Sequence, residues 1–476
     1  MSREIRADYE QVLLFPPSVE DWVGSDHPAR FIRDFVDALD LFELGFSVRT
    51  SDVGRPNYAP DLLFKVWLYG YFSSIRSSRK LEKACKEHMG FLWLTGMNAP
   101  DHNSLWRFWA SNRSGLRAMF KKSVQVAVKA GLVGMAVHAV DGTKIKSSSS
   151  SSKVLDKEQL KGLLEKLDDT IDEVMKEVEH SEATETGEHS LPSEMQDAVA
   201  RRQAIEAALM ELEESGRKKI HVGEPEARFM KHRKGVELSY NGQAAADAKS
   251  GIIVAEKVVN DENDTSMLVP MLDQVKKNLG SVAHENLADG GYATGEQLSL
   301  ARKRDYEVLT NPGNSERSSK GAKGKAYHTS KFTYDPERDC CICPHGMILT
   351  FQKARPKRSH QNGVRIYRCR NHKECPYRSD CTKDPKGRVV EISEHHQALV
   401  SQRIKRHSPM GRELLKRRKV IIEPVFAWIK TGLAFTRWDF VGLDKARVQW
   451  SMICSTINLR KLYGWWLTGA VTFETA

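Results

Sequence analysis

Apolar residues recur at helical spacing through the first quarter of the chain. Between Pro60 and about Val133 they fall three and four residues apart in three successive runs, and turn-forming or capping residues separate the runs. Three short helices joined by turns fit a helix-turn-helix module that binds DNA. A plain helical bundle fits the same spacing, so both interpretations stay open at this point.

The period changes to two at residues 135–146, where the sequence MAVHAVDGTKIK alternates as a strand does. Further strand-like runs are found at 236–247 and 251–259, on either side of a hairpin signal. The pattern then predicts a helix at about 265–278, a strand at 281–288, a helix at 294–304, a strand at 306–309, and late helices at about 411–431 and 444–462. Such alternation is typical of a mixed α/β sheet covered by helices.

A heptad pattern interrupts this series. Apolar residues step by four and three at Leu160, Leu164, Leu167, Ile171, Val174 and Val178, and a looser pattern at Ile205, Leu209 and Leu212 follows a turn at about 181–193. The pattern predicts an antiparallel helical hairpin inserted at 153–220. Six positions make fewer than three heptads, which favours an internal seam over a dimer zipper.

Charge is unevenly distributed along the chain. The 73 Lys+Arg and 62 Asp+Glu give a net charge of +11, yet residues 151–220 carry 10 − 18 = −8, residues 301–390 carry 21 − 9 = +12, and residues 401–420 carry 8 − 1 = +7. A basic surface of this size favours a polyanion such as DNA. No run of about 18 apolar residues exists and the N-terminus is charged, so we expect a cytoplasmic protein without membrane insertion.

Six of the eight cysteines lie between residues 340 and 381. In a reducing compartment such a cluster indicates metal binding rather than disulfides. The preferred ligands for a structural Zn²⁺ are Cys343, Cys369, Cys375 and Cys381, since adjacent Cys340 and Cys341 do not easily both join one site. An iron–sulfur cluster, or reduced cysteines that pack a small core, are the alternatives. The basic segment 353–370 is so polar that we expect it to have little core of its own and to need the metal to fold into a DNA-contacting subdomain.

Two aspartates follow apolar strand runs, and one glutamate lies on a late helix. Asp141 follows AVHAV, Asp289 follows HENLA, and Glu423 is surrounded by apolar residues. Each alone is ambiguous, because an Asp before Gly is usually a turn former. Together, three carboxylates from separate elements can hold two Mg²⁺ or Mn²⁺ ions for in-line phosphoryl transfer.

Other polar residues of these strands and turns have simpler explanations. Asp247, Asp261 and Asp264 are expected in strand-end and turn roles, with Asp247 a reserve candidate for the metal site, and His138 is expected to pack.

The order of these motifs resembles a known family. DGT at 141–143, ADGGY at 288–292, and Glu423 with Lys430 seven residues later resemble the Asp-Asp-Glu (DDE) transposases of bacterial insertion sequences that carry a Tyr-x2-Arg-x3-Glu-x6-Lys signature. Residues 54–112 resemble the helical N-terminal domain of these transposases, particularly those of the insertion sequence 1182 group. The signature's Tyr and Arg fall on Lys416 and Lys419, and Arg417 or Arg418 could substitute for them.

The resemblance implies an α/β fold with an RNase H-like mixed-sheet catalytic core and two insertions. The implied parts are a helical DNA-binding domain at 1–130, a catalytic domain at 131–465, the acidic hairpin at 153–220 and a basic Cys-rich subdomain at 313–390. Asp141, Asp289 and Glu423 would bind two Mg²⁺ or Mn²⁺ ions, and the DNA-contacting residues would be Lys416, Arg418, Lys419 and Lys430.

The resemblance also implies the reaction and its partners. The protein would cleave the ends of a transposable element and join them to target DNA, acting on double-stranded DNA as a homodimer associated with the nucleoid. A metal-dependent nuclease without strand transfer, a DNA-binding regulator or inactive remnant without catalysis, and a zinc hydrolase are the competing hypotheses.

Overall fold

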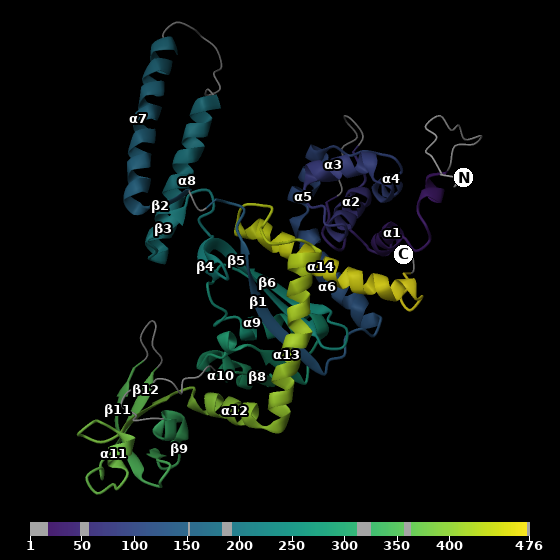
Figure 1. Ribbon diagram of the computed structural model, residues 1–476. Helices are drawn as coiled ribbons and strands as arrows, with labels where there is room; N and C mark the ends of the chain where they lie inside the picture. Colours follow the sequence, from purple (N-terminus) through teal and green to yellow (C-terminus); the bar gives the residue numbers. More distant parts are fainter. Residues whose placement is uncertain are drawn as a thin grey trace, which may run out of the picture. The chain divides into compact units, whose positions relative to one another are not determined.

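The computed structural model describes residues 18–47, 57–150, 153–182, 193–311, 325–356 and 363–473. Contacts divide the chain into two compact units (Figure 1). The helical unit comprises residues 1–131, 146–227 and 429–476, and the sheet unit comprises residues 132–145 and 228–428. No helix in the described part of the chain is both long and apolar enough to cross a membrane.

The helical unit is built around a core of aromatic side chains. Its first helices are α1 (Pro28–Asp37), α2 (Pro60–Phe72), α3 (Ser78–Glu87), α4 (Met89–Leu94), α5 (His102–Ser111) and α6 (Arg113–Lys129), after a 3₁₀ turn at Val19–Trp22. Most of α2 is buried because its sequence is apolar on nearly every side. The C-terminal helix α14 (Leu443–Leu467) packs against α2 and α6. The helical N-terminal region predicted from the sequence is therefore present.

Part of the predicted heptad seam lies between two long helices of the same unit, and the side chains of Val174 and Val178 lie outside the described residues. Strands β2 (Val154–Asp156) and β3 (Lys219–His221) pair at the base of α7 (Lys157–Glu182) and α8 (Ser193–Ser215). Leu160 of α7 and Ile205 and Leu212 of α8 are buried in one cluster, which gives this pair of helices its own small core. Most of the predicted turn, residues 183–192, lies outside the described residues.

The sheet unit contains a mixed six-stranded sheet, as the alternating pattern predicts. Its strands are β1 (Val137–Lys146), β4 (Arg228–His232), β5 (Gly235–Asp247), β6 (Ile253–Val259), β7 (Glu285–Ala288) and β8 (Val308–Thr310). The order is β4-β5-β1-β7-β8, with β6 also paired to β5. Strands β1, β7 and β8 run parallel, whereas β4 and β6 are antiparallel to β5.

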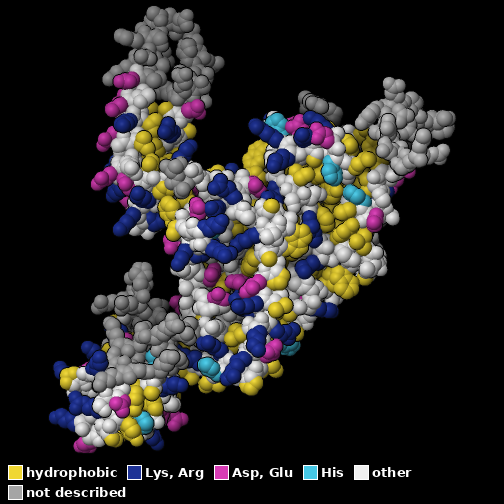
Figure 2. All heavy atoms as spheres, viewed as in Figure 1, with side chains coloured by type: hydrophobic (Ala, Val, Ile, Leu, Met, Phe, Trp, Pro, Cys, Tyr) yellow, Lys and Arg dark blue, Asp and Glu magenta, His cyan; other side chains and the backbone are white. Residues whose placement is uncertain are grey.

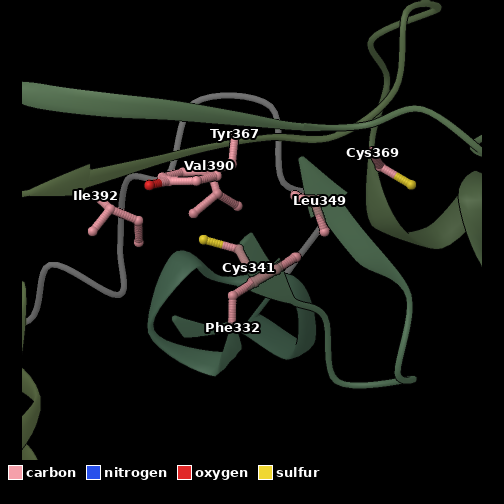
Figure 3. Close-up of a cluster of buried hydrophobic side chains, with 7 residues drawn as sticks. All are labelled: Phe332, Cys341, Leu349, Tyr367, Cys369, Val390 and Ile392. Atoms are coloured by element: carbon pink, nitrogen blue, oxygen red, sulfur yellow. The ribbon is translucent and has the colours of Figure 1, made fainter. Parts of the chain in front are cut away.

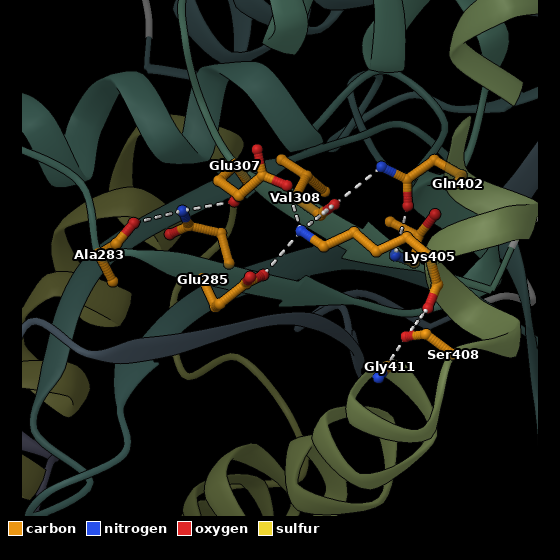
Figure 4. A network of polar contacts seen from close by, with 10 residues as sticks. Ala283, Glu285, Glu307, Val308, Gln402, Lys405, Ser408 and Gly411 are labelled. Atoms are coloured by element: carbon orange, nitrogen blue, oxygen red, sulfur yellow. Dashed lines mark hydrogen bonds and ion pairs between the residues drawn. The ribbon is translucent and has the colours of Figure 1, made fainter.

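Four helices pack on or beside this sheet: α9 (Leu268–Leu279), α10 (Gly295–Lys303), α12 (His396–His407) and α13 (Pro409–Ala427). Helix α13 contacts β5, β7 and β8. Polar contacts fix α12 to the sheet edge: Lys405 Nζ lies 2.9 Å from Glu285 Oε2 and also binds Glu307, and Gln402 accepts from Thr310 N at 3.1 Å (Figure 4). Because α12 leads directly into α13, these contacts also place α13 over the sheet.

The Cys-rich segment folds as a separate antiparallel sheet in the order β13-β12-β11-β10-β9. Its elements are β9 (Thr333–Asp335), β10 (Cys340–Ile342), β11 (Ile348–Arg355), β12 (Val364–Cys369), α11 (Arg378–Cys381) and β13 (Val389–Ser393). The expectation of little core was made for residues 353–370, and of that stretch only Tyr367 and Cys369 belong to the apolar cluster of this sheet. Seven buried residues form this cluster: Phe332, Cys341, Leu349, Tyr367, Cys369, Val390 and Ile392 (Figure 3). Strand alternation within the basic sequence supplies these inward positions.

Candidate active site

Two aspartates lie side by side at the centre of the mixed sheet. The parallel pairing of β1 with β7 brings Val140 opposite Ala288, so the next residues along the two strands are Asp141 and Asp289. Strand β7 ends there, and β1 continues past Asp141 to Lys146. Because adjacent strands lie about 4.8 Å apart, the register alone makes the two carboxylates neighbours.

Backbone N–H groups orient both carboxylates. Asp141 Oδ1 accepts from the N–H of Gly142 at 2.9 Å. Asp289 caps a 3₁₀ turn at Gly290–Tyr292 and accepts from the N–H of Gly291. Each aspartate therefore uses one oxygen for its own loop and keeps capacity to bind a ligand.

Arg418 of α13 forms an ion pair with one of the two aspartates. Its Nη1 lies 2.9 Å from Asp141 Oδ2, and the two side chains are 13% and 20% exposed. Burial raises the pKa of Asp141, and the negative charge of Asp289 adds to this rise. Arg418 and the N–H of Gly142 act in the opposite direction. The site thus has a shortage of positive charge that a bound cation would correct.

A third carboxylate lies at the same place, and sequence analysis treated it as a turn residue. Asp264 Oδ1 accepts from Asn241 Nδ2 at 2.7 Å and from Gln243 Nε2 at 2.6 Å. A Cβ added at Gly142 would lie 2.7 Å from that same oxygen. Nothing in the run NDENDTS distinguishes Asp264 from its acidic neighbours, because its partners lie more than twenty residues earlier.

Tyr292 lies within reach of all three carboxylates. Its buried hydroxyl donates to Gln243 Oε1. Burial first, and then the charges of Asp264, Asp141 and Asp289, hold the pKa of Tyr292 well above its usual value. The phenol therefore stays protonated and serves as a hydrogen-bond donor beneath the site.

Glu423 is exposed on α13. Among the described residues, its carboxylate forms no hydrogen bond and no ion pair. It shares one face of the helix with Lys416 and Lys419, which are also exposed. The structure thus brings Asp141 and Asp289 together, whereas Glu423 of α13 is exposed. Helix α13 continues through Pro424 to Ala427, so the proline does not end it.

A basic hollow lies beside this helix face. Its lining consists of Asn311, Arg406, His407, Arg412, Leu415, Lys416 and Lys419. Figure 2 shows Lys and Arg side chains on the surface over α12 and the start of α13. Two of the predicted DNA-contacting residues, Lys416 and Lys419, line the hollow, whereas Arg418 binds Asp141. The fourth, Lys430, is exposed in a π-helical turn at Trp428–Gly432 in the helical unit.

Four cysteines of the Cys-rich sheet lie near one another. Cys343 Sγ accepts from the N–H groups of His345 and Met347, each at 3.3 Å. Burial raises the pKa of Cys369, and the charges of Cys375 and Cys343 raise it further. Burial also raises the pKa of Cys381, to about 11. The charge of Arg388 acts against this rise, whereas Cys343, Cys375 and Cys369 add to it.

The remaining cysteines of this segment have a packing role. Cys341 points into the apolar cluster, while the Cys369 sulfur is directed away from it (Figure 3). Within the described residues, no three His, Cys, Asp or Glu side chains are gathered closely enough to hold a metal ion, here or at Asp141 and Asp289. The packing alternative from the sequence therefore describes Cys341, and Cys369 belongs to the same cluster with Cys343 and Cys381 packed against it. Zinc binding by Cys343, Cys369, Cys375 and Cys381 stays a prediction.

Two segments match known family models. Residues 342–463 match a model described as a transposase DDE domain, and residues 17–111 match one described as a transposase domain (DUF772). No curated protein and no solved structure matches the chain. Both family matches indicate DNA transposase function, and the DDE match implies an RNase H-like fold and divalent metal ions. The matched DDE segment contains α13 with Glu423 but not Asp141 or Asp289.

Proposed function

We propose that this chain is a DDE transposase that cleaves the ends of a transposable element and transfers them to target DNA, with Asp141, Asp289 and Glu423 as its catalytic carboxylates. The observation that carries the proposal is the pairing of Val140 with Ala288, which makes Asp141 and Asp289 neighbours on parallel strands. Asp289 follows the carboxyl end of β7, where sites of α/β sheets form, and the register puts Asp141 of β1 beside it. The transposase matches at both ends of the chain support the same function.

The donor atoms at this site fit Mg²⁺ or Mn²⁺. Both prefer carboxylate oxygens, and Asp141 and Asp289 offer these in a partly buried position with too little positive charge around them. Two such ions, when bound, activate the attacking oxygen and stabilise the leaving oxygen of a phosphodiester. Asp141 and Asp289 would hold them from the sheet and Glu423 from α13, which requires this helix face to turn toward the sheet.

The basic residues of α12 and α13 would bind the DNA backbone. Lys416 and Lys419 lie on the same helix face as Glu423 and line the basic hollow, so a phosphate bound there lies close to that carboxylate. Lys430 would contact the transposon end, and Arg418 would exchange Asp141 for a phosphate when metal binds. Lys416 and Lys419 each offer a single charged ammonium group, where the family signature has the aromatic ring of Tyr and the two-pronged guanidinium of Arg.

The nucleophiles would be water in the cleavage step and the freed 3′-hydroxyl in strand transfer. Both ends must be held together for transfer, so the active form would be a homodimer on double-stranded DNA, in the cytoplasm and on the nucleoid. Within the DDE transposases, the chain would be nearest the insertion sequence 1182 group with the Tyr-Arg-Glu-Lys signature, which the order of its motifs supports.

The Cys-rich sheet would hold one structural Zn²⁺. Cys343 already accepts two backbone N–H groups, as thiolate ligands of zinc commonly do, and Cys369 directs its sulfur away from the apolar core. With Cys375 and Cys381 these supply four thiolates for a tetrahedral site. The cation would deprotonate the thiols and draw them closer together than they lie here.

The test uses the full-length protein with duplex DNA that carries the inverted repeats flanking its coding region, together with a target plasmid and Mg²⁺. We expect cleavage at the repeat ends followed by joined products. Cleavage without joined product would instead favour the nuclease. Binding of end DNA with neither cleavage nor joining in Mg²⁺ or Mn²⁺ would favour the regulator or inactive remnant.

A further inference from the structure

Asp264 lies near the glycines that follow the two aspartates of the sheet, although it comes from a different element. It belongs to the loop between β6 and α9. A Cβ at Gly142, next to Asp141, would lie 2.7 Å from Asp264 Oδ1, and a Cβ at Gly291, close to Asp289, would lie 3.7 Å from Asp264 Oδ2. Glycine at position 142 leaves room for this carboxylate, and Gly291 lies at ordinary contact distance from it.

Two amides of β5 hold the Asp264 carboxylate by one oxygen only. Asn241 and Gln243 are two residues apart on one face of the strand, and both donate to Oδ1. Gln243 accepts from Tyr292 with its own oxygen, which fixes its nitrogen toward Asp264. Oδ2 has no hydrogen bond among the described residues, so it is available to a ligand.

A second polar atom supports a ligand at this point. Asn241 is 1% exposed, and its Oδ1 has no hydrogen-bond partner among the described residues. That oxygen lies 3.0 Å from the position of a Gly142 Cβ, on the same side as Asp264. A buried carbonyl oxygen without a partner is costly, and a bound cation or its water shell would satisfy it.

A turn role does not account for these contacts. An aspartate that forms a turn binds backbone N–H groups one to three residues ahead. The Asp264 side chain instead binds two amide side chains of a distant strand, and α9 begins after Met267 without any side-chain cap.

We propose that Asp264 is a further ligand of the divalent cation held by Asp141 and Asp289, with Asn241 and Gln243 as positioning residues that present its free oxygen. The inference rests on the proposed metal-dependent function. It gives the sheet three carboxylates from three separate segments before α13 contributes any.

Mn²⁺ titration of the full-length protein, followed by the electron paramagnetic resonance signal of free Mn²⁺, tests this inference. Asp264→Asn keeps an oxygen that accepts from both amides but loses the charge, so a purely structural role would survive the change. We expect Mn²⁺ affinity to fall roughly tenfold. Asp261→Asn, an exposed carboxylate of the same loop, is the matched control and should bind as the unmodified protein does.

The outcomes separate the two proposals. Weaker Mn²⁺ binding in Asp141→Asn with unchanged binding in Asp264→Asn would overturn the role of Asp264 and keep the metal site. Failure of the unmodified protein to bind Mn²⁺ would overturn both. A second measurement needs no variant: Fe²⁺ with ascorbate and peroxide cuts the chain next to a bound ion. Fragments ending near residues 141, 264 and 289 are expected, and cuts near 141 and 289 without one near 264 would contradict the proposal.

Discussion

Arg418 Nη1 lies 2.9 Å from Asp141 Oδ2, so a guanidinium takes up the negative charge that a metal ion would otherwise neutralise. Both side chains are mostly buried, and charges interact more strongly there than at an exposed surface. A cation that binds Asp141 must share its carboxylate with Arg418 or displace it. The ion pair therefore holds the site together in the absence of metal and competes with metal binding.

Replacing Arg418 with alanine should tighten Mn²⁺ binding by roughly tenfold, because a competing charge worth about 1–2 kcal/mol is removed. The titration is best made at mildly alkaline pH, because the raised pKa of Asp141 makes its ionised form less favourable at lower pH. Arg417→Ala removes an exposed neighbouring charge and is the control. Equal affinities for Arg418→Ala and Arg417→Ala would show that Arg418 does not compete with the ion.

Asp141→Asn and Asp289→Asn should each lower the rate of end cleavage by about 1000-fold, since lost metal stabilisation of the transition state is worth several kcal/mol. Binding of end DNA should stay within a few-fold, because neither residue lies in the basic hollow. Glu262→Gln removes an exposed carboxylate of the sheet unit and should cleave normally. Cleavage of end DNA at the unmodified rate by Asp289→Asn would remove that residue from the catalytic site.

Lys416 and Lys419 should contribute to DNA affinity through phosphate charge. The double change to alanine is expected to lower the slope of log affinity against log salt by about 2, one unit for each lost contact. Fluorescence anisotropy with a duplex at several salt concentrations measures this slope. Lys161→Ala on α7 removes an exposed lysine from the acidic hairpin and serves as control. If the double variant has the same salt-dependence slope as the unmodified protein, DNA does not bind at Lys416 and Lys419.

The two aspartates of the sheet could be predicted from sequence because each ends an apolar strand run, which is a local signal. Their neighbour Asp264 could not, because its role depends on Asn241 and Gln243, and no periodicity in the run NDENDTS indicates which acidic residue turns inward. A glycine directly after Asp141 was the available clue, since the close approach of Gln243 and Asp264 excludes a larger residue there.

The late helix shows a different limit of sequence reasoning. Helical periodicity predicts α13, but charged residues occur on several of its sides, so the pattern does not decide which face meets the sheet. The structure turns Arg418 toward Asp141 and leaves Glu423 exposed. In the Cys-rich segment the short strands alternate among many basic residues, and composition alone therefore hides a core that the alternation provides.

Zinc content should distinguish the four predicted ligands from the other cysteines. Cys375→Ser is expected to lower the zinc-to-protein ratio from about one to near zero, because three thiolates hold the ion weakly. Cys340→Ser, in β10 of the same sheet, should keep zinc. Elemental analysis of protein purified without added metal measures the ratio. Absence of zinc from the unmodified protein, or equal loss in both variants, would contradict the assignment.

Asp247 should stabilise the sheet unit rather than take part in chemistry. Its carboxylate accepts from the N–H groups of Gly134, Met135 and Lys249 at 2.9–3.2 Å, and it lies 3.4 Å from His138 Nε2. Burial would raise the pKa of Asp247, but the close contact with His138 and the hydrogen bonds from Gly134 and Lys249 outweigh it, and the pKa lies below its usual value.

Asp247→Ala is therefore expected to lower the free energy of unfolding by about 3 kcal/mol, since it leaves buried donors without a partner. A depressed pKa contributes stability above the unfolded value near 4, and this contribution is lost as the pH falls through the folded value. The difference between Asp247→Ala and the unmodified protein in urea unfolding should hence be larger at pH 7 than at pH 3. Asp305→Ala, an exposed aspartate after α10, is the control. A pH-independent difference would mean that the Asp247 charge contributes nothing and that the loss is one of packing alone.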